Sequence, residues 1–239
     1  MGIKRMIFDK ISYLPSGYLL PLLGLNKKPE FVFGKKFDKR FTGLKTGSLR
    51  GNTEIELLSI INNAIQNVPY YSNKYRGKKI TSIKEFKNTI TFIDKDIVVQ
   101  NFEDFKSQTI DFNGYELQTT GGTSGKPLKI YQPKNRYIRE LAAVYFAWAK
   151  VDYDFDVRAV MRNHNLKKGK VFQVNPITKE IQFNNFNNDE DYFKLIYKTI
   201  LKYKVRYFHA YPSAAYNFAS YCKRNNLDIS FLKAFLCSS

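Results

Sequence analysis

The sequence predicts an α/β fold in which a helical N-terminal part precedes alternating strands and helices. Up to about residue 110, apolar residues recur at helical spacing behind helix-start signals. Beyond that point, short apolar runs alternate with amphipathic segments, which is the pattern of a sheet covered by helices. We therefore expect a helical part at 1–110 and the first part of an α/β core at 111–239.

Two helices are expected in the first part because each has a start signal. Thr53 and Glu56 have the spacing of a capping box, and Pro69 ends the helix that follows. Ser82 and Glu85 have the same spacing ahead of a shorter helix. The first helix has apolar side chains on one face, which predicts burial of that face: Leu57, Leu58, Ile61, Ile65 and Val68.

An apolar run at 11–25 precedes these helices. Pro15, Gly17 and Pro21 interrupt it, and it is too short to span a bilayer. We expect this run to dock onto the protein's own core, and a position at a membrane interface is the alternative.

In the second part, strand and helix patterns alternate along the chain. Expected strands cover 128–131, 158–161, 205–209 and 232–237, with a hairpin around Pro176. Expected helices cover 135–150, 189–203 and 213–225. Ligands of such sheets bind beyond the carboxyl ends of the strands, so the turn at 209–213 is where a substrate pocket belongs.

Composition limits the class of protein. Hydrophobic residues make up 44% of the 239 residues, which is enough for a packed core. Two cysteines and two histidines indicate neither a disulfide framework nor a zinc site, and they fit a reducing, cytoplasmic setting.

The formal charge of +18 comes from 39 basic and 21 acidic residues. The basic residues are spread along the chain without a helix-turn-helix, zinc-finger or RNP-type motif, so no nucleic-acid partner is expected. An excess of Lys, Asn, Ile, Phe and Tyr is also what an AT-rich coding sequence produces. Weak association with the anionic inner face of a membrane is the alternative.

The most informative segment is the glycine- and hydroxyl-rich run at 119–127. Its glycines let the backbone approach a ligand, and its hydroxyls, N–H groups and Lys126 can contact phosphate oxygens. The run is not a Walker A loop, because Thr120 stands where a glycine belongs and Pro127 where a Ser or Thr belongs. A solvated turn between two strands is the alternative interpretation.

This run instead resembles the phosphate loop of adenylate-forming enzymes, the acyl- and aryl-CoA synthetase superfamily. Their pattern has the form Thr-Ser-Gly-Thr-Thr-Gly-x-Pro. Ser124 matches in kind and Gly121 replaces the usual serine. The identical positions are Thr120, Gly122, Thr123, Gly125 and Pro127.

The flanking segments resemble one branch of that superfamily, the phenylacetate–CoA ligase-like or CapK-type proteins. The matches follow in order from about residue 52 to the end: 57–71 with its Val-Pro-Tyr-Tyr turn, 82–97, the Tyr-Pro-Ser turn at 211–213, and the final Ser-Ser. The resemblance implies an adenylate-forming ligase that activates a carboxylate with ATP. It also implies a setting in capsule or other surface-polysaccharide biosynthesis.

The same resemblance implies ATP and Mg²⁺ as cofactors and a small-molecule carboxylate as substrate, with coenzyme A as a candidate acceptor. The implied phosphate-binding residues are Thr119, Thr120, Gly121, Gly122, Thr123, Ser124, Gly125 and Lys126. The implied acyl-substrate residues are His209, Tyr211, Pro212 and Ser213. The structural alternative is that Ser213 only caps the next helix and that His209 is a packed strand residue. No catalytic or metal-binding residue is assigned.

In the family, the adenine, ribose and magnesium motifs and a C-terminal domain with a catalytic lysine come after the segment that this sequence matches. The chain therefore resembles the N-terminal portion of such an enzyme, truncated before the adenine site. We expect the chain alone to be inactive. A degenerate non-catalytic homologue and a basic peripheral membrane-binding protein are the alternatives.

Overall fold

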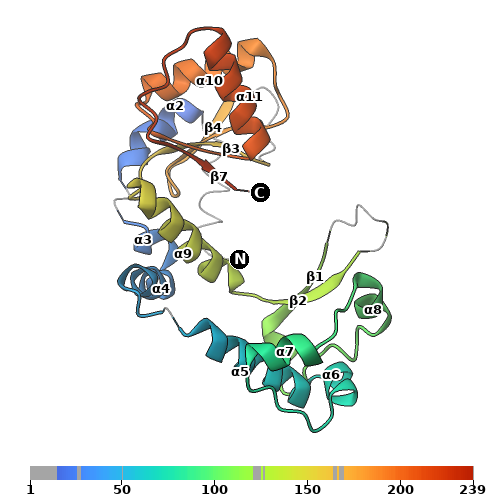
Figure 1. Cartoon of the computed structure of the whole chain (residues 1–239). Helices are drawn as coiled ribbons and strands as arrows, with labels where there is room; N and C mark the ends of the chain where they lie inside the picture. Colours follow the sequence, from blue (N-terminus) through green and yellow to red (C-terminus); the bar gives the residue numbers. More distant parts are fainter. Residues whose placement is uncertain are drawn as a thin grey trace. The chain divides into compact units, whose positions relative to one another are not determined.

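The computed structural model describes residues 15–25, 28–49, 51–120, 125, 127–163, 166 and 170–238. Contacts divide the chain into a sheet unit, Met1–Thr42 with Leu141–Ser239, and a hairpin unit, Gly43–Glu140. Helices come first and a parallel-rich sheet follows, which confirms the predicted α/β class (Figure 1). The division predicted at residue 110 stays a prediction.

The hairpin unit begins with a run of helices, and the side chains of Asn52, Ser82 and Asp94 cap three of them. The helices are α5 (Thr53–Asn67), α6 (Pro69–Lys74), α7 (Ile83–Thr89) and α8 (Lys95–Gln100), followed by the short helix η2 (Phe112–Gly114). Pro69 ends α5 as predicted and is the first residue of α6, where its missing N–H costs nothing.

The capping box predicted at Thr53 and Glu56 is wrong. Asn52 caps α5, because its Oδ1 accepts from the N–H groups of Glu54 at 3.0 Å and Ile55 at 3.3 Å. Thr53 is already inside the helix. Ser82 does cap α7 through the N–H of Glu85 at 3.2 Å.

The hairpin unit ends in two antiparallel strands, β1 (Tyr115–Thr119) and β2 (Lys129–Pro133). Tyr131 on β2 packs against Phe112, with ring centroids 4.6 Å apart, and against Phe102 at 5.9 Å. These aromatic contacts hold β2 against η2 and against the segment that follows α8.

The sheet unit contains five strands in the order β4-β5-β3-β6-β7. The strands are β3 (Arg158–Met161), β4 (Phe172–Asn175), β5 (Glu180–Phe183), β6 (Tyr207–Ala210) and β7 (Ala234–Cys237). Neighbouring strands are parallel except β4, which pairs with β5 antiparallel as the hairpin predicted around Pro176.

One face of this sheet is apolar. Ala159, Ile181 and Phe208 belong to a buried cluster with residues of α10 (Glu190–Lys202) and α11 (Pro212–Arg224), and Figure 1 shows both helices on this side. The N-terminal elements α2 (Ser16–Leu19) and η1 (Leu20–Gly24) join the same cluster through Leu19 and Leu23. The predicted docking of the apolar run onto the core is therefore confirmed for Leu19 and Leu23, whereas Tyr18 and Leu25 of the same run are exposed.

The other face of the sheet carries polar side chains. Arg158 and His209 are buried there, and they contact residues of α9 (Arg136–Trp148), whose C-terminal half belongs to the sheet unit. The short helix η3 (Ala149–Val151) follows α9, and α3 (Glu30–Phe33) and α4 (Lys35–Thr46) add Phe33 and Phe37, whose rings pack on Tyr145. Buried polar groups such as these need hydrogen-bond partners inside the protein.

Candidate functional site

The predicted phosphate loop is described only at its ends. Thr119, Thr120 and Gly125 are exposed, and the other predicted loop residues lie outside the described residues: Gly121, Gly122, Thr123, Ser124 and Lys126. Thr120 and Leu128 close the loop, because the N–H of Thr120 donates to the carbonyl of Leu128 at 3.0 Å and the N–H of Leu128 to Oγ1 of Thr120 at 3.1 Å. The Thr120 hydroxyl is thus used as an acceptor in the hairpin and keeps its proton for another partner.

Gly125 has a backbone reason to be glycine. Its φ is +83°, and an added Cβ would meet nothing within 4 Å. The left-handed backbone conformation, and not a close neighbour, therefore disfavours other residues here.

The second predicted region lies at the carboxyl edge of the sheet. Arg162, Tyr211 and Ser238 each directly follow the last residue of a parallel strand, β3, β6 and β7 respectively. His209 lies within β6 and is 8% exposed. Because carboxyl ends of parallel strands meet at one edge, residues far apart in sequence come together there.

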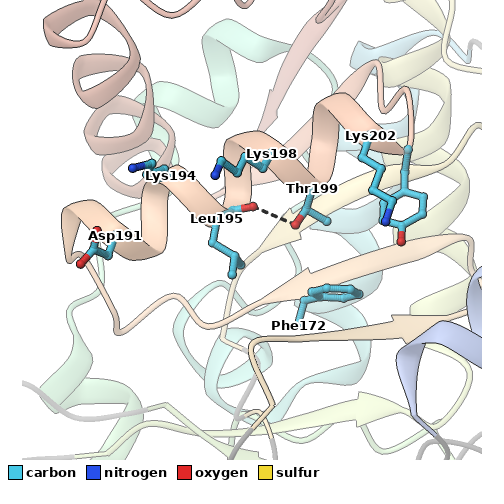
Figure 2. A pocket seen from close by; sticks show the side chains of 8 residues that line it. Phe172, Asp191, Lys194, Leu195, Lys198, Thr199 and Lys202 are labelled. Atoms are coloured by element: carbon cyan, nitrogen blue, oxygen red, sulfur yellow. Dashed lines mark hydrogen bonds between the residues drawn. The ribbon is translucent and has the colours of Figure 1, made fainter.

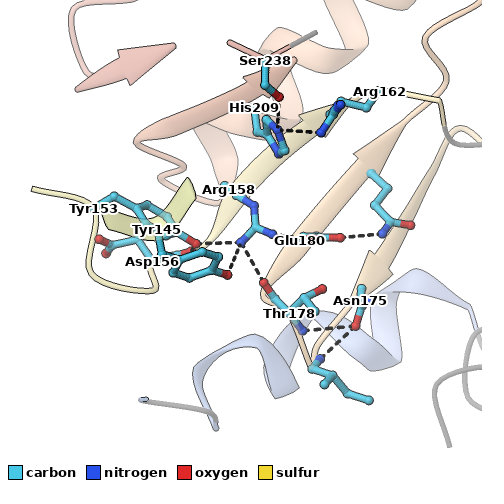
Figure 3. Close-up of polar contacts among 12 residues, drawn as sticks. Tyr145, Tyr153, Asp156, Arg158, Arg162, Asn175, Thr178, Glu180, His209 and Ser238 are labelled. Atoms are coloured by element: carbon cyan, nitrogen blue, oxygen red, sulfur yellow. Dashed lines mark hydrogen bonds and ion pairs between the residues drawn. The ribbon is translucent and has the colours of Figure 1, made fainter. Parts of the chain in front are cut away.

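The side chains of Arg162 and Ser238 converge on the imidazole of His209 (Figure 3). Nη1 of Arg162 lies 3.4 Å from Nε2 of His209, and Oγ of Ser238 lies 3.3 Å from the same atom. The Trp148 ring packs edge-on against His209 with centroids 4.8 Å apart. The guanidinium of Arg162 also lies over the Tyr211 ring, 4.9 Å from its centroid.

The chemistry of Arg162 decides how His209 takes part. A guanidinium has donors only, so Nε2 of His209 accepts from it. This arrangement requires a neutral imidazole with its ring proton on Nδ1. Arg162 is then the charged group of the cluster, and His209 and Ser238 are its neutral polar neighbours.

The predicted acyl-substrate residues differ in their surroundings. His209 is buried and Tyr211 is half-buried, and Arg162 contacts both. Pro212 and Ser213 are exposed in the first turn of α11. Tyr211 occupies the cap position of α11 without a side-chain cap bond, so Ser213 does not cap this helix. A substrate role for the turn stays a prediction.

Sequence reasoning missed Arg162, Ser238 and Trp148 as members of this cluster. Arg162 and Ser238 each follow a short apolar run that was predicted as a strand, which is a usable signal. No such signal marks Trp148 in the sequence, because an aromatic residue near a helix end is more often part of the hydrophobic core.

A buried ion pair lies under the Trp148 ring. Arg158 pairs with Glu180 and donates to the Tyr153 hydroxyl at 2.7 Å, and its Cζ lies 5.3 Å from the Trp148 ring centroid. Burial acts to lower the pKa of Arg158, but the charge of Glu180 and the contacts with Tyr145 and Tyr153 together outweigh it and the pKa is raised. Arg158 therefore stays charged, and the pair supports the ring that contacts His209.

A described pocket lies elsewhere, on the basic face of α10 (Figure 2). It has a volume of about 450 Å³ and is lined by Phe172, Asp191, Lys194, Leu195, Lys198, Thr199, Lys202 and Tyr203. None of the sequence-predicted site residues lines this pocket. Its lysines recur at every fourth position and so share one face of the helix.

Two further properties concern metals and membranes. Within the described ranges, no group of three or more His, Cys, Asp or Glu side chains is placed to hold a metal ion. Every helix in the described part of the chain is too short or too polar to cross a membrane.

Comparison with known proteins gives partial likenesses. No protein-family model matches the chain, and no curated protein matches its sequence. An open conformation of 2-hydroxyisobutyryl-CoA ligase in complex with 2-HIB-AMP and CoA is 13% identical with a TM-score of 0.47, covering 72% of this chain and 42% of the ligase. The same ligase in the thioesterification state is 15% identical with a TM-score of 0.44, covering 72% and 39%. The chain thus spans less than half of the ligase, and a likeness at this level assigns it no activity.

Proposed function

We propose that this chain supplies the phosphate loop and part of the substrate pocket of an enzyme that activates a carboxylate as an acyl-adenylate. The observation that carries the proposal is the run at 120–127, which matches the family pattern and lies between paired strands rather than before a helix. A strand–loop–strand setting removes the Walker A interpretation.

The chemistry needs two kinds of protein group. A carboxylate oxygen attacks the α-phosphorus of ATP and pyrophosphate leaves, so the protein must align the reactants and offset charge on the phosphates. The hydroxyls of Thr119, Thr120, Thr123 and Ser124 and the loop N–H groups are the proposed phosphate donors. The sheet edge around His209 and Tyr211 is the proposed place for the acid. When bound, Mg²⁺ offsets phosphate charge.

The finer parts of the proposal rest on the sequence resemblance. They are a role in surface-polysaccharide assembly, a cytoplasmic location and coenzyme A as a candidate acceptor. We also propose that the 239 residues alone do not catalyse exchange between ATP and pyrophosphate, because the family's adenine and magnesium motifs have no match among them.

Calorimetric titration of the chain with Mg·ATP tests the loop. We expect saturable binding that weakens about tenfold or more in a Thr123→Ala/Ser124→Ala double variant, since each lost donor to a charged group is worth about 1.5 kcal/mol or more. Thr109→Ala, an exposed hydroxyl in the same unit, is the matched control and should bind normally. Binding that survives the double variant, or no binding at all, would contradict the role given to the loop.

An exchange screen tests the reaction itself. Purified chain is incubated with Mg·ATP, labelled pyrophosphate and a panel of carboxylic acids, and no exchange is expected. Robust exchange by the 239 residues overturns the expected inactivity and supports adenylate formation directly.

The lysine face of α10 favours a second candidate, peripheral binding to an anionic membrane. Lys194, Lys198 and Lys202 line one pocket on the helix surface, and each lysine near such a surface contributes about 1 kcal/mol. Binding to phosphatidylserine vesicles that is lost at high salt, and reduced by replacing the three lysines with glutamine, would support it. Binding that is equal for neutral vesicles would exclude it.

A further inference from the structure

Within the described part of the chain, no carboxylate compensates the charge of Arg162 at the sheet edge. Its Nε atom is buried and has no hydrogen-bond partner among the described residues, and no described Asp or Glu forms an ion pair with it. The sequence from 157 to 179 also contains no acidic residue. Partial burial of a cation is unfavourable unless an anion or a set of acceptors replaces the lost water.

The surroundings of Arg162 make this placement still less favourable. Its guanidinium stacks on Tyr211, which is the cap residue of the 13-residue helix α11. The N-terminus of a helix carries partial positive charge, so it attracts anions and disfavours cations. Arg162 thus contacts the residue at the positive end of α11, and an anion bound to Arg162 would offset the charge there.

We propose that Arg162, His209 and Ser238 form a subsite for the carboxylate group of a small organic acid. The planar fork of Arg162 matches the two oxygens of a carboxylate. The Ser238 hydroxyl donates to Nε2 of His209 and so holds the imidazole that contacts Nη1 of Arg162. The rings of Trp148 and Tyr211 border the cluster and provide apolar contact for the rest of the acid.

A carboxylate fits this subsite better than a phosphate. Arg162 supplies one positive charge and the neutral His209 supplies none, so a single negative charge is balanced and a phosphate dianion is not. The identification of this acid as the acyl substrate rests on the proposed function. The binding of a carboxylate by Arg162 does not, and it is tested without ATP.

Trp148 makes the test direct because it is the only tryptophan in the chain and its ring contacts His209. Benzoate, its neutral analogue benzamide and inorganic phosphate are titrated separately into the full chain while Trp148 emission is recorded. Excitation at the red edge of the indole absorption avoids the tyrosines. We expect a saturable change with benzoate, and neither benzamide nor phosphate should match it.

The variants assign that response to Arg162. Arg162→Met should weaken benzoate binding about tenfold or more, because a charge-assisted donor pair is lost. Arg206→Met is the matched control, since Arg206 is a half-exposed arginine that pairs with Asp156 and does not contact the cluster. Its benzoate affinity should equal that of the wild type. Circular dichroism establishes that each variant is folded.

Several results would overturn the inference. They are equal responses to benzoate and benzamide, tighter binding of phosphate, no saturable response to any probe, or wild-type benzoate affinity in Arg162→Met. If Arg162→Met does not fold, the benzoate affinity of Arg162→Lys is measured instead. An affinity within about twofold of wild type would overturn the role given to the guanidinium fork.

The outcome is separable from that of the proposed function. Benzoate binding that depends on Arg162 stands even if Mg·ATP never binds the loop. Normal Mg·ATP binding together with benzoate binding that ignores Arg162 would overturn this inference alone.

Discussion

Arg158 and Glu180 lie opposite each other on the parallel strands β3 and β5 and form an ion pair inside the sheet unit. Their side chains are only 5% and 13% exposed. Glu180 also accepts from Nε2 of Gln182 at 2.7 Å, and Arg158 donates to the Thr178 carbonyl at 3.1 Å. The pair is thus part of a buried polar network beneath α9, and water cannot replace either partner at low cost.

Glu180→Gln should destabilise the sheet unit by about 3–5 kcal/mol, because it leaves a buried cation without its carboxylate. Urea unfolding followed by Trp148 emission measures the loss. Asp156→Asn breaks the more exposed pair with Arg206 and should cost less than about 1 kcal/mol. Similar losses for both variants would mean that burial does not govern the strength of these pairs.

Leu19→Ala should destabilise the sheet unit by about 2–5 kcal/mol, because Leu19 is 1% exposed in the apolar cluster. Leu25→Ala is the control from the same segment, since Leu25 is 73% exposed and should be nearly neutral. Equal and negligible effects in urea unfolding would indicate that the segment does not dock in solution and would favour the membrane-interface alternative.

Gly125→Ala should cost about 1 kcal/mol, because the positive φ is unfavourable for a residue with a Cβ. Gly114→Ala is the matched control, since its φ lies outside the left-handed region and its Cβ also meets open space. Comparative urea unfolding of the hairpin unit by far-UV circular dichroism measures the difference. A Gly125→Ala variant as stable as Gly114→Ala would show that the loop backbone adapts freely.

Asn52→Ala should destabilise α5 by about 1 kcal/mol, since two N–H groups lose their acceptor. Thr53→Ala should change the stability by only a few tenths of a kcal/mol, because Thr53 is inside the helix. Thermal unfolding monitored by helical circular dichroism compares the two. The reverse order of effects would restore the capping box that the sequence suggested.

Cys222 should resist alkylation in the folded protein at neutral pH. Burial raises its pKa to about 11, so the reactive thiolate forms only as the pH approaches that value. Cys237 is exposed and should react first. Mass spectrometry of iodoacetamide-treated protein should show one fast adduct, absent from Cys237→Ser, and a second after unfolding. Rapid double labelling of the native chain would contradict the burial of Cys222.

Local sequence determined several of the elements. The strand predicted at 158–161 is β3 with the same bounds, Pro69 ends α5, and the hairpin forms around Pro176. Side-chain periodicity and chain-breaking residues act within a few positions, so they can be interpreted without the fold. The cap at Asn52 escaped prediction because adjacent Asn and Thr are both good caps, and the backbone angles of Asn52 decide between them.

Only the tertiary structure decided the cluster around His209. Arg162 and Ser238 lie 47 and 29 positions from His209 in sequence, and no local pattern relates them. Their meeting depends on the strand order β3-β6-β7 and on a register that pairs Val160 with His209 and His209 with Leu236. Strand order and register come from packing over the whole sheet, which is the physical reason that the sequence alone placed His209 in a strand and could not identify its partners.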